Sequence, residues 1–522
     1  MEDRIIPEDE LIQIRLQKWD KMKEMGKNPF DIEKFDRYAK FEKEDGTSEN
    51  ISYKSTDLKK EFETRENSEL RTIDKGKITT GYAGRIVSYR LMGKAAFATL
   101  ADRAGKIQVY LKKDDLSEDF DIVKLLDLGD FIGVNGYIFR TKTGEISIHA
   151  TKLTVLAKSI RPIPFGKEKD GHQWNLMSDV ELRYRQRYVD LVINEHSKNI
   201  FIQRSKIVSA MREFYENRGY LEVETPVLQS IAGGAAARPF LTHHNALDMK
   251  LHLRISLELY LKRLIVGGLE KVFEIGRVFR NEGIDTRHNP EFTLMESYEA
   301  YANLEDIMEL VENMLRFICQ KTHGKESCVF NGEEIDFSKP FRKLPILEGI
   351  KEYAGIEPSA FDSLETAITA MKSVGLDTDG ETLVGGIIEK IHERFVQPKL
   401  IQPTFITDFP LETSPLAKKH LDNPNLTRRF EIYIAKQECG NAFSEINDPV
   451  EQKERFVMQE HLKAAGDDEA HPMDEDYIRA LEYGMPPCGG LGIGIDRLVM
   501  IILDQTSMRD VLLFPQMKSI SE

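Results

Sequence analysis

The sequence lacks several features that would assign it to particular classes of protein. It has four cysteines in 522 residues, far apart and without a Cys-x-x-Cys pair, which argues against both a zinc knuckle and a disulfide framework. No apolar run approaches the ~20 residues that cross a bilayer. The start, MEDRIIPEDE, has no apolar targeting core. We therefore expect reduced thiols, a cytoplasmic location and no membrane partner.

An excess of basic residues is also missing. A formal charge of -15 is unusual for a protein that holds nucleic acid only by diffuse attraction. The segment from Lys75 to Lys158 differs, because its 14 basic and 9 acidic residues leave it at +5. The chain is long enough for about three domains, and 41% hydrophobic residues provide for large cores.

The first 160 residues contain two kinds of pattern. Residues 1–70 include apolar positions at roughly helical intervals from Leu11 to Met22, which predict an N-terminal helical extension. This helix is interpreted as a packing helix, with direct contact to nucleic acid as the alternative. Residues 71–160 show five short alternating runs separated by glycines, typical of a five-stranded OB-type β-barrel. The fold alone leaves open a protein-contact module, but the basic surplus favours nucleic acid.

Residues 161–178 have the Pro, Gly and charge content of a linker, and the rest of the chain mixes strands and helices. Within it, residues 271–298 predict an antiparallel hairpin with a long tip, GIDTRHNP. Alternation places Val278, Arg280 and Glu282 on one face. The second strand likewise aligns Phe292, Leu294, Glu296 and Tyr298. Burying such a wall is costly unless a charged ligand completes it; the alternative is an ion-pair network within the sheet.

The segment GRVFRNEGIDTRHNPEFTLMESY resembles motif 2 of the class II aminoacyl-tRNA synthetases, Phe-Arg-x-Glu, a loop, and His-x-x-x-Phe. The resemblance implies an α+β catalytic domain over 179–522, with an antiparallel sheet flanked by helices. It implies that Arg280 contacts the α-phosphate of ATP and the amino acid carboxylate, and that Phe292 stacks on adenine. Glu282 would lie near the adenine amino group and His288 near the outer phosphates.

Near the C-terminus, GGLGIGIDRLVMIIL has glycines at alternating positions, Gly490, Gly492 and Gly494, which leave one strand face bare for a flat ligand. This segment resembles motif 3 of the same synthetases, in which Arg497 would pack against adenine and the γ-phosphate and Gly494 would also contact ATP. The sequence has Asp496 where the family most often has Glu. Walker-type loops are absent from the sequence, so arginines and magnesium would hold ATP.

The segment GYLEVETP resembles motif 1, which implies that Pro226 lies at a homodimer interface. We expect one strand, YLEVETPVL, after a helix ending at Gly219. A proline that merely ends a strand is the alternative.

Two glutamates in EIYIAKQECGNAFSEIND, Glu431 and Glu438, would share one face of a hairpin with a turn near Ala435 and Lys436. Converging carboxylates beside a triphosphate suit Mg²⁺, and the resemblance implies two or three Mg²⁺ ions bound with ATP. A solvated acidic face is the alternative.

Specificity must come from groups opposite the substrate side chain. The candidate carboxylates are Glu258, Glu296 and Glu445. A set of acidic groups of this size fits an amino acid with two ammonium groups. Four segments, GGAAARPFLTHHNALD, FRNEGIDTRHNPEFT, GNAFSEINDP and GGLGIGIDRL, resemble the class II lysyl-tRNA synthetases. The resemblance implies that Glu258 and Gly234 contact the α-amino group and that Glu445 and Tyr298 hold the ε-ammonium. Glu296 and Asn441 would complete the pocket, with a bulge near Gly440 turning Asn441 and Glu445 inward.

In the barrel, Arg85, Phe97 and Gln108 match residues of the anticodon-binding OB domain of the lysine, aspartate and asparagine synthetases. The resemblance implies that Phe97 stacks on an anticodon base and Gln108 hydrogen-bonds one. Residues 330–400 are expected to form an inserted helical subdomain.

Together these resemblances imply a ligase whose partners are ATP, L-lysine, tRNA(Lys) and a second copy of the chain, and not DNA. An aspartate or asparagine ligase of the same fold, a non-catalytic RNA- or protein-binding paralogue, and lysylation of a protein are the rival interpretations. An aspartate enzyme should show a cation facing the carboxylate of its substrate side chain, and asparagine would leave buried glutamates unpaired.

Overall fold

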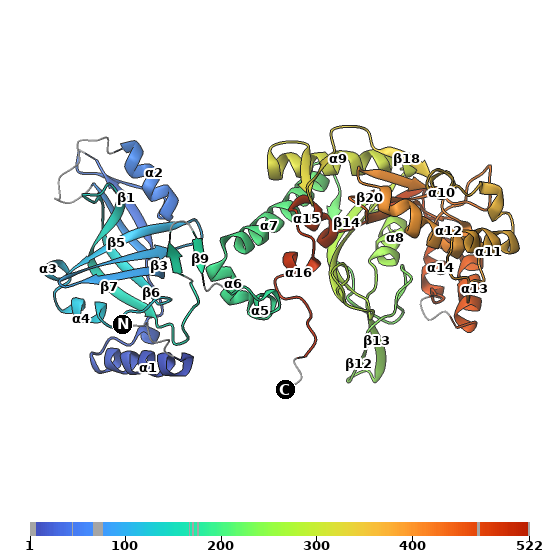
Figure 1. Cartoon of the computed structure of the whole chain (residues 1–522). Coiled ribbons are helices and arrows are strands. Elements are labelled where there is room, and N and C mark those ends of the chain that lie inside the picture. The colour runs from blue at the N-terminus through green and yellow to red at the C-terminus, as the bar shows by residue number, and fades with distance from the viewer. Residues whose placement is uncertain are drawn as a thin grey trace. The chain divides into compact units, whose positions relative to one another are not determined.

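The chain forms two compact units, Met1–Ser178 and Asp179–Glu522 (Figure 1). The computed structural model describes residues 7–43, 45–65, 77–165, 167–169, 172–174, 177–466 and 470–519. None of the helices in this described part has the length and hydropathy needed to span a membrane.

A closed five-stranded barrel forms the body of the first unit, which confirms the predicted OB fold. The strand order is β3-β4-β5-β7-β6, and β3 also pairs with β6 to close the barrel. The strands are β3 (Ile78–Met92), β4 (Ala95–Ala101), β5 (Lys106–Lys112), β6 (Phe131–Arg140) and β7 (Ile146–Ala157). Buried residues alternate strictly along β4 and β5, as expected for a barrel whose interior is filled by side chains. Three short helical turns, α3 (Lys113–Leu116), η2 (Ser117–Asp119) and α4 (Phe120–Val123), connect β5 to β6.

The N-terminal extension is not purely helical, in contrast to the prediction. Helices α1 (Glu8–Glu24) and α2 (Ser55–Arg65) and the 3-10 turn η1 (Pro29–Asp31) are joined by strands β1 (Tyr38–Glu42) and β2 (Ser48–Asn50). Strand β1 pairs with β3, so it adds to the barrel sheet. Only one residue of β1, Ala39, is fully buried. The period-two signal was therefore too weak to reveal this strand. After the barrel, β8 (Lys167–Lys169) pairs with β9 (His172–Trp174).

An eight-stranded sheet forms the centre of the second unit. Its six inner strands are antiparallel, while the edge strands β10 and β18 run parallel to their neighbours. In spatial order the strands are β10 (Leu221–Glu222), β14 (Lys271–Phe279), β15 (Glu291–Ala300), β22 (Cys488–Gly494), β21 (Gln437–Ser444), β20 (Arg429–Ile434), β19 (Thr404–Thr407) and β18 (Arg342–Pro345). The expected catalytic architecture, an antiparallel sheet with helices, is confirmed.

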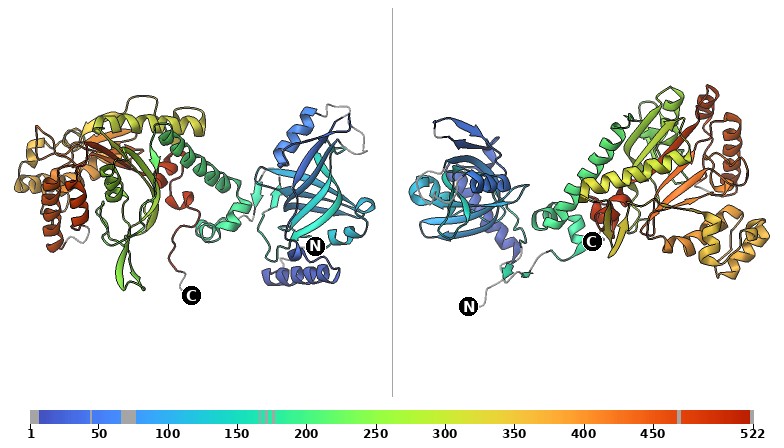
Figure 2. Two further views of the ribbon diagram at one scale, coloured as in Figure 1. Left: turned by 180° about the vertical axis from the view of Figure 1, so that it is seen from behind. Right: turned by 90° about the horizontal axis from the view of Figure 1, so that it is seen from above.

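Helices cover this sheet on both faces, as two further views show (Figure 2). Long helices α7 (Glu195–Glu216) and α9 (Leu304–His323) bury an apolar core against one face together with α15 (Ile495–Ile502). Helix α9 starts at a capping box formed by Asn303 and Asp306 and ends at the left-handed Gly324. Helices α8 (Glu258–Val266) and α14 (Glu475–Glu482) belong to a second core that includes Tyr298 of β15. Outside residues 330–400, the second unit also contains α5 (Val180–Arg185), α6 (Arg187–Ile193), α13 (Pro449–Ala464) and α16 (Met508–Val511).

The segment expected as a helical insertion begins with strands. A hairpin of β16 (Ser327–Phe330) and β17 (Glu333–Asp336) precedes β18, which lies in the main sheet. The helical part runs from α10 to η5 and has an apolar core of its own, which also reaches Tyr433 of β20. Its elements are α10 (Ile346–Ala354), η3 (Pro358–Phe361), α11 (Leu364–Ser373), α12 (Val384–Ile391), the π-helical turn η4 (His392–Val396) and η5 (Gln397–Lys399).

The expected continuous strand YLEVETPVL is broken into β10 and β11 (Leu228–Gln229), so this prediction was wrong. Between the two pieces, Glu274 of β14 accepts hydrogen bonds from the backbone N–H of Thr225 and from its hydroxyl, at 3.0 and 2.7 Å. Pro226 has no N–H with which to continue a ladder. Strand β11 instead joins β13 (Met249–Leu253) and β12 (Leu241–His244) in a separate three-stranded sheet.

Candidate active site

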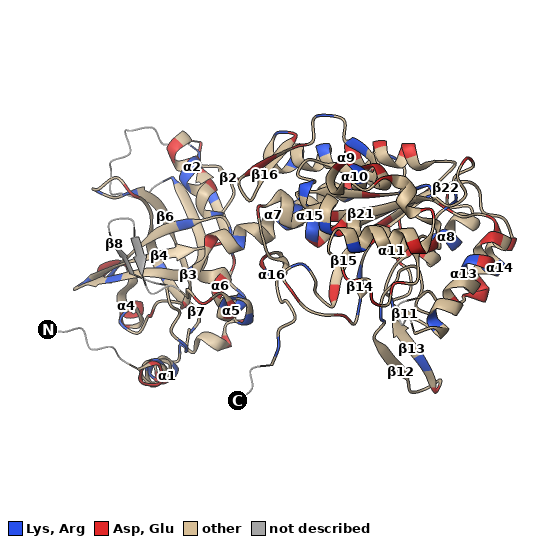
Figure 3. Cartoon of the chain, turned by 45° about the vertical axis from the view of Figure 1, so that its right-hand side comes forward, with Lys and Arg blue, Asp and Glu red and all other residues tan. Residues whose placement is uncertain are grey.

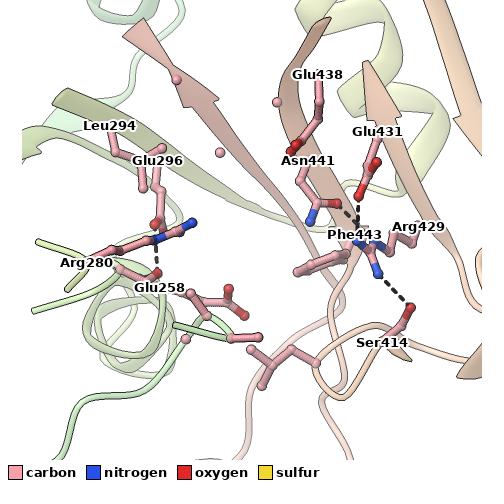
Figure 4. Close-up of a pocket in the computed structure, with 18 of the residues that line it drawn as sticks. Glu258, Arg280, Leu294, Glu296, Ser414, Arg429, Glu431, Glu438, Asn441 and Phe443 are labelled. Carbon is pink, nitrogen blue, oxygen red and sulfur yellow. Dashed lines mark hydrogen bonds and ion pairs between the residues drawn. The ribbon is translucent and has the colours of Figure 1, made fainter. Parts of the chain in front are cut away.

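A single cavity of about 560 Å³ collects side chains from distant parts of the catalytic unit. All fourteen residues expected to bind ATP, the amino acid or metal line it. They are Gly234, Glu258, Arg280, Glu282, His288, Phe292, Glu296, Tyr298, Glu431, Glu438, Asn441, Glu445, Gly494 and Arg497. Figure 4 shows Arg280, Glu258 and Glu296 on one side of the cavity, with Arg429, Glu431, Glu438 and Asn441 on the other.

The β14–β15 hairpin supports the first side of the cavity. The predicted antiparallel hairpin is confirmed, and in it Val278 lies opposite Phe292 and Phe279 opposite Glu291. Strand β14 ends at Phe279, earlier than expected, so Arg280 lies just beyond it and donates its backbone N–H to Pro290 O at 2.8 Å. The Arg280 guanidinium lies 5.1 Å from the centre of the Phe292 ring. An arginine and an aromatic face are thus presented together, as a nucleotide requires.

Three buried carboxylates converge at one end of the cavity. Glu296 accepts hydrogen bonds from Ser256 Oγ at 2.8 Å, from the Leu257 N–H at 3.0 Å and from the Tyr298 hydroxyl at 3.0 Å. Burial and repulsion from Glu258 raise the pKa of Glu296 to about 7. Burial, with further repulsion from Glu258, raises the pKa of Glu445 to about 8. This end of the cavity therefore favours a cationic ligand.

A lysine of the chain itself lies behind two of these carboxylates. Lys262 of α8 is fully buried, donates to Glu258 Oε1 at 2.5 Å and forms an ion pair with Glu445. Burial by itself opposes its charged form, but Glu258 and Glu445 raise the pKa of Lys262 well above its usual value. Lys262 was not among the residues predicted from the sequence, although the i, i+4 spacing of Glu258 and Lys262 is that of ion pairs on a helix.

The second carboxylate pair is organised by a tight hairpin. Ala435 and Lys436 have φ values of 51° and 66°, so they form the predicted turn between β20 and β21. Ile432 pairs with Gly440 and Tyr433 pairs with Glu438, which leaves Cys439 as the extra residue of a β-bulge. The predicted bulge near Gly440 is confirmed.

Glu431 and Glu438 differ in their surroundings. Glu431 accepts from Arg429 at 2.6 Å and from the Tyr433 hydroxyl at 2.7 Å. Burial, with repulsion from Glu438, raises the pKa of Glu431 to about 7 in spite of Arg429. Glu438 is more exposed and pairs with Arg497 at 3.3 Å.

Arg429 lines the cavity but was not among the site residues predicted from the sequence. It bridges Glu431, Ser414 Oγ at 3.0 Å and Asn441 Oδ1 at 3.2 Å, so it fixes one candidate metal ligand and one candidate substrate contact together. The alternation in RFEIYI puts Arg429, Glu431 and Tyr433 on one strand face, and this signal could have revealed it.

The outer end of the cavity is basic. Arg497 donates to Glu438 O at 2.8 Å, and its second Nη lies 3.2 Å from His288 Nε2. Asp285 in turn holds His288 Nδ1 at 2.8 Å. Asp496, the departure from the usual motif 3, accepts the Thr293 N–H at 2.7 Å and pairs with Arg204 at 2.6 Å. One carboxylate oxygen of Asp496 is therefore hydrogen-bonded and the other ion-paired within the protein.

Magnesium fits this donor set only together with a nucleotide. In the described ranges no group of three His, Cys, Asp or Glu residues is placed to hold a metal ion. Glu431 and Glu438 supply two hard oxygen donors whose mutual repulsion a cation would relieve. Mg²⁺ is commonly bound by one or two carboxylates, with phosphate oxygens and waters completing its octahedron.

The expected RNA contacts lie on the barrel. Phe97 pairs across strands with Tyr110 and with Arg90, and the Phe97 and Tyr110 rings are 4.9 Å apart. Gln108 accepts from Ser147 Oγ at 2.9 Å. Arg85 lies in the middle of β3, opposite Ala101 and not Phe97; it donates to Gly129 O, and its guanidinium lies 4.1 Å from the centre of the Phe131 ring. Arg90, not Arg85, is thus the arginine directly beside Phe97.

Comparisons with known proteins agree with this geometry. The family profile for tRNA synthetases class II (D, K and N) matches residues 179–518, and the profile for the OB-fold nucleic acid binding domain matches residues 82–156. A lysine–tRNA ligase from Thermoanaerobacter pseudethanolicus is 50% identical over 511 residues, covering 98% of this chain and 96% of the relative. Those of Syntrophomonas wolfei (50%; 98% of this chain, 97% of the relative) and Pelotomaculum thermopropionicum (53%; 84% and 85%) are similar. The chain belongs to the class II tRNA synthetases and, within them, to the lysine–tRNA ligases.

Proposed function

We propose that this chain activates L-lysine with ATP and transfers the lysyl group to tRNA(Lys). The lysine carboxylate attacks the α-phosphate of ATP, which releases pyrophosphate and forms lysyl-adenylate. A hydroxyl of the 3′-terminal ribose then attacks the acyl carbon, and AMP leaves. The observation that carries this proposal is the convergence of Glu258, Glu296 and Glu445 beside Arg280 in one cavity.

Lysine lies with its carboxylate towards Arg280 and its two ammonium groups among the buried glutamates. Gly234 and Glu258 contact the α-ammonium, while Glu445 and Tyr298 hold the ε-ammonium, with Glu296 and Asn441 completing the site. Gly234 has φ +90°, and a side chain there would meet Ser256 Oγ at 2.8 Å. Charge-assisted hydrogen bonds to both ammonium groups favour lysine over singly charged amino acids.

ATP lies across the glycine face of β22. Phe292 stacks on adenine, and Glu282 accepts a hydrogen bond from the adenine amino group. The phosphates and the other side of the base are contacted by Arg280, His288, Arg497 and Gly494. Glu431 and Glu438 would hold magnesium, which would neutralise the charge that develops on the phosphates. No general base is needed, because the attacking carboxylate is already ionised.

The barrel reads the anticodon through Phe97 and Gln108, with Arg85 as the arginine inferred from resemblance. We assign residues 1–70 as an extension, 71–160 as the anticodon-binding domain, 161–178 as a linker and 179–522 as the catalytic domain. Two copies associate through the region of Pro226, where Leu221, Leu228 and Leu241 are half or more exposed. The enzyme acts in the cytoplasm.

Pyrophosphate exchange into ATP, measured separately with lysine, aspartate and asparagine, tests the amino acid. Exchange should depend on lysine. Exchange with aspartate or asparagine alone would overturn the assignment, and absence of exchange with any amino acid would favour a non-catalytic RNA- or protein-binding role. Charging of tRNA(Lys) transcripts then tests the second step.

A further inference from the structure

Lys262 is an ionised side chain in the interior, outside the residues that line the cavity. It lies one helical turn after Glu258 on α8 and behind the carboxylates of Glu258 and Glu445. Its side chain has no exposed surface. An apolar side chain of similar length would avoid the desolvation of a buried ammonium. The charge at this position therefore demands a reason other than packing.

The charges around the amino acid end of the cavity supply that reason. Glu258, Glu296 and Glu445 carry three negative charges when all are ionised, and Lys262 reduces the sum to two. A doubly cationic amino acid has two ammonium groups to offer, since its carboxylate pairs with Arg280. With Lys262 the charges of the pocket and the two ammonium groups cancel. Without Lys262 one buried carboxylate would have no cationic partner.

The placement of Lys262 also orients Glu445. The ammonium pairs with Glu445 Oε2. The other oxygen, Oε1, is buried without a hydrogen-bond partner among the described residues, and it lies beside Gly490 of the glycine strand. One oxygen is thus held from behind while the other remains for a ligand.

We propose that Lys262 is a specificity-determining positioning residue, a permanent internal counter-ion that sets the charge of the amino acid pocket at two and aims Glu445 Oε1 at the substrate ammonium. This inference rests on the proposed lysine specificity. It adds to it that the chain's own lysine selects a ligand with two positive charges.

A double-mutant cycle of Lys262→Met and Glu445→Gln tests the coupling, with lysine-dependent pyrophosphate exchange as the assay. Lys262→Met should raise the KM for lysine about tenfold or more and leave the KM for ATP within about twofold. The double variant again carries two carboxylates and no internal cation. It should therefore bind lysine no worse than Glu445→Gln alone.

Losses that multiply in the double variant, or an unchanged lysine KM in Lys262→Met, would overturn the proposal, because a packing role predicts independent effects. If Lys262→Met alone fails to fold, the comparison of the double variant with Glu445→Gln decides the question. Lys351→Met on the exposed side of α10 is the matched control and should behave as wild type. Failure of the wild type to exchange with lysine would contradict the proposed function itself.

Discussion

The carboxylate of Glu445 occupies the space that a side chain at Gly490 would need in the cavity. A Cβ atom at Gly490 would lie 1.9 Å from Glu445 Oε1 and 2.6 Å from the Tyr298 ring. Real atoms cannot approach so closely, so the glycine of the strand allows both groups to reach the amino acid end. The expected bare face of β22 thus makes room for protein side chains as well as for a flat ligand.

Gly490→Ala should therefore displace Glu445 and impair the use of lysine. We expect the lysine KM to rise at least about tenfold, because a charge-assisted hydrogen bond is worth roughly 1.5 to 3 kcal/mol. Steady-state pyrophosphate exchange at varied lysine and saturating ATP measures this change.

Gly492→Ala is the control, since a Cβ there would be 3.7 Å from Glu296, an ordinary contact. This variant should melt close to the wild-type temperature and lose much less lysine affinity. Equal losses at both positions would contradict a specific clash with Glu445.

The local features of this site could be predicted from the sequence, because each depends on neighbouring residues. The β14–β15 hairpin follows from alternation and a loop of turn formers. The turn near Ala435 and Lys436 and the bulge near Gly440 could be predicted from the strand face on which the side chains of the hairpin must lie. Arg280 and Arg497 of the cavity came from two sequence motifs, whereas Arg429 belongs to neither motif and was not predicted.

What could not be predicted depends on partners far along the chain. The role of Lys262 requires Glu445, which is brought beside it only when β21 joins the sheet. The break of motif 1 requires Glu274 of β14 to capture Thr225. Strand β1 has little amphipathic signal, and it becomes a strand by pairing with the first residues of β3, which β4 does not reach.

Lysine affinity should increase with pH between about 6 and 8.5. The pKa values of Glu296 and Glu445 are raised to about 7 and about 8, so below these values the carboxyls hold protons. A protonated carboxyl cannot pair with an ammonium. Binding must then release protons, and affinity falls by up to about tenfold per pH unit for each group.

Calorimetric titration of lysine without ATP, repeated in buffers of different ionisation enthalpy, counts the released protons. Glu445→Gln should lose the step near pH 8 and keep the one near pH 7. A lysine affinity that is flat over this range would contradict the raised pKa values.

The requirement for Mg²⁺ should increase when Glu438 loses its charge. Glu438→Gln removes one of two candidate oxygen donors without leaving a deeply buried partner, since its side chain is 40% exposed. We expect the Mg²⁺ concentration for half-maximal exchange to rise about fivefold or more, while lysine binding without ATP is unchanged. Glu348→Gln on the exposed side of α10 controls for the loss of a surface charge, and an identical Mg²⁺ dependence in both variants would exclude Glu438 as a ligand.

Separate defects in the two steps should follow from changes in the barrel. Phe97→Ala removes one ring of the Phe97–Tyr110 pair, and loss of one stacked base costs about 1 to 3 kcal/mol, or roughly 5- to 150-fold in the KM for tRNA. Pyrophosphate exchange without tRNA should stay at the wild-type rate, because Phe97 lies in the other compact unit. Phe131→Ala is the matched control on β6, where Arg85 covers the ring.

Arg90 lies opposite Phe97, whereas Arg85 donates a hydrogen bond to Gly129 O. Arg90→Ala should therefore weaken charging more than Arg85→Ala. A larger loss of charging in Arg85→Ala than in Arg90→Ala would instead support Arg85 as the arginine that contacts the anticodon.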